Sequence, residues 1–94
     1  MNANIKIEDI EKSFNQIEGR KFLLFNFGDL SRDRYITIYD ASNKAKFIEM
    51  INEELELIFE SKPFKVEPYE QHIAIYDDNI SLCLADWTDG VISC

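Results

Sequence analysis

The segment 43–60 constrains this chain most, because its apolar and acidic residues separate cleanly on a helix. At about 100° per residue, one face collects the apolar side chains of Phe47, Ile48, Ile51, Leu55, Ile58 and Phe59. The opposite face collects the carboxylates at spacings of i, i+4, i+7 and i+11, which belong to Glu49, Glu53, Glu56 and Glu60. The spacing predicts one amphipathic helix over 43–60, begun by Ser42 or Asn43 and ended before Pro63. We call the four glutamates the acidic row.

A second helical pattern precedes the segment 43–60. Ile7, Ile10, Phe14 and Ile17 recur at i, i+3, i+7 and i+10, which predicts an amphipathic helix from about residue 5 to residue 18. Gly19 stands where a left-handed residue would end that helix.

The remaining segments predict strands, because apolar and polar residues alternate between turn residues. The predicted strands are 21–27, 35–39, 64–69, 72–76 and 80–87, with 91–94 as a further short one. The short connections favour antiparallel hairpins, and Pro68 favours an edge position or a bend for its strand. We expect one α+β domain over 1–94, in which an antiparallel sheet of four to five strands packs with two helices in two layers.

The strands 21–27 and 35–39 carry apolar or aromatic side chains on both faces. If no helix covers the second face, it presents an exposed aromatic patch for homodimerisation or complex assembly. The residues of that patch would be Phe22, Leu24, Tyr35 and Tyr39. If the first helix covers them, they belong to the core, and the sequence leaves both interpretations open.

The net charge of −8 is unevenly distributed. Residues 1–46 contain eight Lys/Arg against seven Asp/Glu, whereas residues 47–94 contain two against eleven. Such a field would repel nucleic acid and anionic membranes and attract a basic protein surface. The alternative is that the acidic charge only keeps a small protein soluble.

No catalytic, cofactor or metal motif accompanies these patterns. His72 with Cys83 and Asp86 is the best enzymatic combination, but no local motif surrounds them, and a lone histidine in a strand is more often structural. One histidine and two separated cysteines, Cys83 and Cys94, lack zinc-site spacing, and the three glycines form no phosphate loop. We expect no enzyme, no cofactor, reduced thiols and a cytoplasmic protein without a membrane span or signal peptide.

The acidic row is the feature with the best support as a functional surface. Like charges at i, i+4 destabilise a helix by a few tenths of a kcal/mol per pair, so a helix optimised for stability would interleave lysines. Beside the row lie Met50 and Leu57 as candidate apolar anchors. Four aspartates at strand turns form a second candidate acidic group: Asp77, Asp78, Asp86 and Asp89.

In size and acidity the chain resembles small proteins that neutralise nucleases, such as toxin immunity proteins and phage anti-CRISPR proteins. The resemblance covers overall character and carries over no functional residue. It implies a non-enzymatic inhibitor that covers the basic active-site or nucleic-acid-binding surface of a partner protein. The alternative is an adaptor or structural subunit that assembles through the aromatic sheet face, and the sequence leaves open whether the protein is a monomer or a homodimer.

Overall fold

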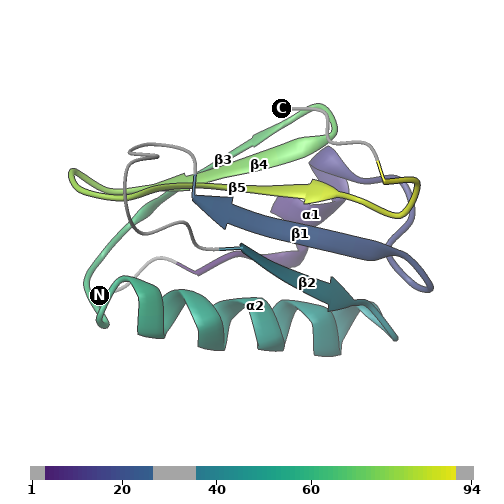
Figure 1. Ribbon diagram of the computed structural model, residues 1–94, viewed down its shortest axis with the longest axis horizontal. Helices are drawn as coiled ribbons and strands as arrows, with labels where there is room; N and C mark the ends of the chain where they lie inside the picture. The colour runs from purple at the N-terminus through teal and green to yellow at the C-terminus, as the bar shows by residue number, and fades with distance from the viewer. Residues whose placement is uncertain (1–3, 27–35, 91–94) are drawn as a thin grey trace.

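A five-stranded antiparallel sheet and a long helix form two layers in the computed structural model, which describes residues 4–26 and 36–90 (Figure 1). The elements in chain order are α1 (Ile7–Ser13), β1 (Lys21–Asn26), β2 (Ile36–Asp40), α2 (Lys44–Ile58), β3 (Lys65–Tyr69), β4 (His72–Tyr76) and β5 (Ser81–Asp86). The predicted α+β architecture is therefore confirmed, and the sheet of the described residues has five strands, of which β3 is one. The predicted strand 91–94 lies outside the described residues.

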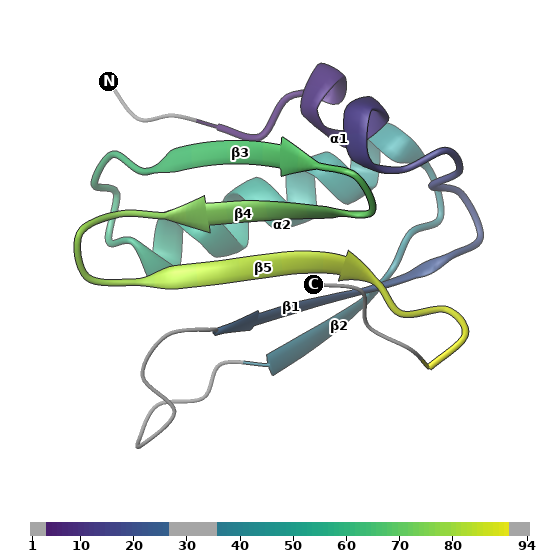
Figure 2. The same cartoon turned by 90° about the horizontal axis from the view of Figure 1, so that it is seen from above.

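The strand order in the sheet is β2-β1-β5-β4-β3. Three neighbouring pairs are hairpins of consecutive strands, and the fourth joins β1 to β5, which lie far apart in the sequence (Figure 2). In this pairing Leu24 lies opposite Leu84. β3 is an edge strand, which is the first of the two alternatives that Pro68 indicated, since an edge position tolerates a residue that lacks a backbone N–H.

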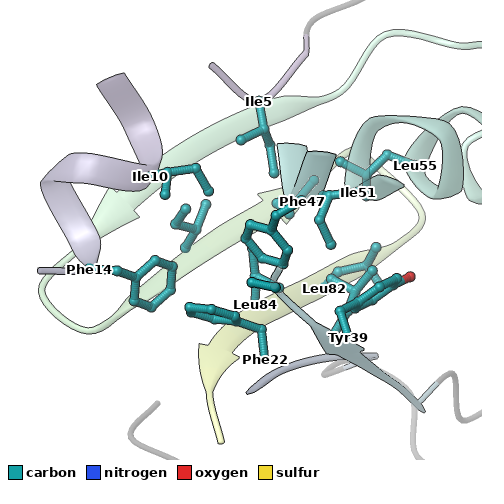
Figure 3. Close-up of a cluster of buried hydrophobic side chains, with 14 of the residues drawn as sticks. Ile5, Ile10, Phe14, Phe22, Tyr39, Phe47, Ile51, Leu55, Leu82 and Leu84 are labelled. Atoms are coloured by element: carbon teal, nitrogen blue, oxygen red, sulfur yellow. The ribbon is translucent and has the colours of Figure 1, made fainter. Parts of the chain in front are cut away.

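The core lies between α2 and one face of the sheet (Figure 3). Phe47 of α2 packs against Phe22 of β1 with ring centroids 4.6 Å apart, and Phe14 reaches the same ring edge-on at 4.9 Å. Along the helix and strands the cluster continues through Ile51, Leu55, Ile73, Ile75, Leu82 and Leu84. The apolar stripe predicted for this helix is thus the side that packs on the sheet.

The long helix begins as predicted but ends earlier. Asn43 is the N-cap, and its Oδ1 accepts a hydrogen bond from the Lys46 N–H at 2.7 Å. The helix ends at Ile58, and Glu60 has a left-handed φ of +56°. The prediction of a helix through residue 60 was wrong at this end, because the chain turns to stack Phe59 on Phe64 in the core, with ring centroids 4.8 Å apart.

The first helix is much shorter than predicted. It ends at Ser13, where the Ser13 carbonyl accepts from the Gln71 N–H and the Ser13 hydroxyl donates to the His72 carbonyl. These bonds attach the chain to the β3–β4 turn, so the residues after Ser13 continue without helical structure. Ile7 is 47% exposed, whereas Ile5 is buried before the helix begins.

The face of β1 and β2 that contains Phe22, Leu24 and Tyr39 is part of the core. Phe22 and Leu24 are fully buried and Tyr39 is buried as well, while Tyr35 lies outside the described residues. The helix that covers them is α2 (Figure 1), whereas the two interpretations left open by the sequence were cover by the first helix or exposure. Phe22, Leu24 and Tyr39 therefore form no exposed aromatic patch.

Candidate functional site

The outer side of α2 carries the acidic row. Glu49, Glu53 and Glu56 are exposed, and none of the described cations lies within ion-pair distance of them. Lys44, at the start of the helix, pairs instead with Glu11 of α1 at 2.7 Å. Glu60 lies beyond the helix and only approaches Lys62, with Nζ and Oε1 3.8 Å apart. The continuous part of the row is therefore three carboxylates on one helix.

The two proposed apolar anchors differ in their surroundings. Leu57 is 75% exposed and lies one helical turn after Glu53. Met50 is half-buried and packs against the core cluster. Leu57 is thus a large apolar side chain in water beside free carboxylates, whereas Met50 already has partners within the fold.

The four turn aspartates do not form one surface. Asp77 and Asp78 lie in the turn before β5, whereas Asp86 and Asp89 lie at and after its other end. Asp77 Oδ1 accepts from the N–H groups of Asn79 and Ile80, which closes the turn. Asp78 and Asp89 are exposed and remain candidates for contact with a partner, but Asp77 and Asp86 are engaged within the fold.

The structure does not bring the enzymatic combination together. Alternation along β5 places Cys83 on the sheet face away from α2 and Asp86 on the other. His72 stacks on Tyr69, with ring centroids 5.0 Å apart. No group of three or more His, Cys, Asp or Glu side chains suited to a metal ion occurs in residues 4–26 and 36–90.

The oxidation state of Cys83 differs from the predicted one. It is buried in β5 and disulfide-bonded, so the expectation of a reduced thiol is wrong for this residue. The other cysteine of the sequence, Cys94, lies outside the described residues.

A polar cleft of about 530 Å³, which the sequence did not reveal, opens at the end of the sheet opposite the β4–β5 turn. Its walls come from the chain after α1, the start of β1, the β3–β4 turn and the end of β5, and they include Phe14, Asn15, Gln16, Arg20, Gln71 and Asp89. Arg20 Nε donates to Asp86 Oδ2 at 2.6 Å across a separation of 66 residues. No spacing rule relates residues so distant in the chain, so this site has no signal in the sequence.

Asp86 also lines this cleft and is held as a carboxylate. Partial burial would raise its pKa, but hydrogen bonds from the Thr88 hydroxyl and N–H and from the Arg20 guanidinium together keep the pKa below its ordinary value. Its Oδ1 accepts from Thr88 Oγ1 at 2.6 Å and its Oδ2 from Arg20. Both oxygens are therefore occupied.

The lowered pKa predicts a specific loss of stability in acid. A carboxyl group whose pKa is lowered by folding stabilises the fold above its ordinary pKa of 3.8, and the contribution disappears as the pH falls through the folded value. We expect Asp86→Asn to be less stable than the wild type at about pH 7, and the difference to narrow at about pH 3. Urea unfolding at both pH values measures this. If the wild type and Asp86→Asn differed in unfolding free energy by the same amount at both pH values, the prediction would be contradicted.

None of the helices in the described part of the chain has the length and apolar composition that crossing a membrane requires. The chain matches no family model, no curated protein and no solved structure.

Proposed function

We propose that this protein is a non-enzymatic inhibitor whose α2 outer face binds a basic surface on a partner protein and blocks it. A nuclease active site or nucleic-acid-binding groove is the expected target, as for toxin immunity proteins and anti-CRISPR proteins. The observation that supports the proposal is the set of exposed carboxylates of Glu49, Glu53 and Glu56, which no described cation neutralises. Direct binding to nucleic acid or to a membrane is not part of the proposal.

The energetics of α2 favour a functional explanation of these charges. Glu49 and Glu53 are spaced i, i+4 and Glu53 and Glu56 i, i+3, so they repel one another and destabilise the isolated helix slightly. Core packing of the opposite face offsets this effect. Lysine or arginine side chains of a partner would remove the repulsion on binding and would accelerate encounter.

Leu57 supplies the apolar component that charges alone lack. Interfaces combine a desolvated apolar centre with a polar rim, and an exposed leucine next to Glu53 and Glu56 has that arrangement. We assign Leu57 as the central anchor and the carboxylates as the rim. Asp78 and Asp89 lie away from this helix, at the turns on opposite ends of β5, and are given no role in this contact.

The test is competition at the partner. Immobilised wild-type protein should retain a basic protein from its natural host, and raising the salt concentration should weaken retention steeply. Added nucleic acid should compete for the same partner, and the protein should inhibit that partner's nucleic-acid binding or cleavage. If retention did not depend on salt and nucleic acid did not compete for the partner, the proposal would be contradicted. The acidic charge would then serve solubility alone.

A cytoplasmic location is part of this proposal, but the disulfide of Cys83 weighs against it. Stable disulfides are rare in the cytoplasm because thiol reductants maintain cysteines in the reduced form. If the protein acts in the cytoplasm, Cys83 should be labelled when cells are lysed in denaturant that contains an alkylating agent, because unfolding then exposes the buried thiol. Mass spectrometry of the labelled protein measures the reduced fraction, and an unlabelled Cys83 would show that the location is wrong.

A further inference from the structure

The polar cleft has the dimensions and rigidity of a ligand site. Its volume of about 530 Å³ falls within the range of small-molecule pockets, about 300–1,000 Å³. One wall is fixed where Gln71 N–H donates to the Ser13 carbonyl at 3.1 Å and Ser13 Oγ donates to the His72 carbonyl at 3.0 Å. The other wall is fixed where the Lys21 N–H donates to Thr88 Oγ1 at 2.9 Å. The cleft is therefore held open by hydrogen bonds within its walls.

Arg20 presents unused hydrogen-bond donors in this cleft. Its Nε is bound to Asp86, which fixes the orientation of the guanidinium plane. Its Nη2 lies 3.8 Å from Asp89 Oδ2, beyond hydrogen-bond distance. Toward residues 4–26 and 36–90, both terminal nitrogens thus keep donors available, in the fork geometry that suits a carboxylate.

Asp89 presents an unused acceptor next to that fork. Its side chain is 85% exposed, and Arg20 is the only described cation near it. Its carboxylate therefore keeps the capacity to accept from an ammonium group.

Backbone strain marks the same place. Gln71 has a left-handed φ of +74° in the two-residue turn between β3 and β4, where glycine or asparagine is favoured. Glycine there would relieve the strain but would remove an amide side chain from the cleft lining. Strained residues of this kind concentrate at functional sites.

We propose that the polar cleft binds a small zwitterion of the α-amino-acid class with a polar, uncharged side chain. Its carboxylate would bind the Arg20 guanidinium and its ammonium group the Asp89 carboxylate. The amides of Asn15, Gln16 and Gln71 would meet the polar side chain, over the ring of Phe14. Because Asp86 already pairs with Arg20, a simple anion would meet two carboxylates beside one guanidinium. A zwitterion brings an ammonium group for Asp89 together with a carboxylate for the terminal N–H groups of Arg20, so it uses both and is preferred over a ligand that carries only one of the charges.

The experiment uses L-glutamine with its decarboxylated and deaminated analogues, which each lack one of the two charges. Calorimetric titration should show L-glutamine binding with a dissociation constant on the order of 1 mM, and each analogue binding at least about tenfold more weakly. In amide-detected NMR, the signals of Asn15, Gln16 and Gln71 should shift. No binding by any polar amino acid, equal binding by an analogue, or binding by a neutral sugar instead would overturn the proposal.

Two variants and one control separate effects on the site from effects on the fold. Asp89→Asn should weaken L-glutamine binding by about tenfold, whereas Asp78→Asn, at the other end of β5, should not change it. Gln71→Gly should raise the thermal midpoint by about 4 °C and still weaken binding. Unchanged affinity in Asp89→Asn, or in a stabilised Gln71→Gly, would overturn the assignment. The outcome does not depend on the proposed role of α2, because the cleft and the acidic row share no residue.

Discussion

Reversing the charges of Glu53 and Glu56 to lysine should reduce affinity for the basic partner by at least about 100-fold, with little change in stability. Each reversal replaces an attraction with a repulsion, and close charge pairs at interfaces contribute about 1.5–7 kcal/mol in measured couplings. The fold should tolerate the change, because both side chains are exposed and have no ion pair with a described residue. Lysine is also a good helix former.

The measurement is binding of wild type and Glu53→Lys/Glu56→Lys to the isolated partner at several salt concentrations. The wild type should lose affinity as salt rises, and the double variant should show a much flatter dependence. Far-ultraviolet circular dichroism and a thermal melt establish that the variant is folded.

A matched control distinguishes position from net charge. Glu18→Lys/Glu70→Lys changes the net charge by the same amount at two exposed glutamates outside α2. It should lower affinity only slightly, through the weaker long-range field. Equal losses in the two double variants would show that only the total charge matters, and unchanged affinity in both would remove α2 from the interface.

Leu55→Ala should mainly lower stability and Leu57→Ala should mainly weaken partner binding, although the two residues lie two positions apart on one helix. Leu55 is fully buried, and its truncation should lower the free energy of unfolding by about 2–5 kcal/mol through lost burial and a residual cavity. Domains are stable by only about 5–15 kcal/mol, so this change removes a large fraction of the total. Leu57 is 75% exposed, and its truncation should change stability by less than about 0.5 kcal/mol.

The same pair divides the effects on binding. Leu57→Ala should weaken partner binding by about tenfold or more if Leu57 is the apolar anchor. Folded Leu55→Ala protein should bind almost as well as the wild type. Urea unfolding and partner titration measure the two quantities. A destabilised Leu57→Ala variant would mean that this side chain is part of the fold, and unchanged binding would exclude it as an anchor.

Local patterns in the sequence predicted the elements whose neighbours are close in the chain. The stripe from Phe47 to Leu55 predicted α2 and its buried side, and the alternation in 72–76 and 80–87 predicted the hairpin of β4 and β5. Asn43 was correctly named among the two candidate caps. In each case the interactions that define the element join residues a few positions apart, so periodicity and turn chemistry contain the information.

The errors occurred where a distant contact competed with local preference. The helical spacing of Ile7, Ile10, Phe14 and Ile17 extended α1 too far, because the Ser13 carbonyl bonds to Gln71 in place of a later helical N–H. Phe22 and Leu24 could not be assigned to the core or the surface until the position of α2 against β1 was known.

The sequence by itself determined an acidic α+β protein with a helix whose glutamates and apolar residues lie on opposite sides, since that separation depends only on a period of about 3.6 residues per turn. The tertiary structure alone decided that β5 lies between β1 and β4, that α2 covers Phe22, and that Glu49, Glu53 and Glu56 have no described cation beside them. It also alone brought Arg20 to Asp86 and so formed the polar cleft. Such pairings depend on how whole elements pack, and packing free energy is a property of the assembled core that no local spacing encodes.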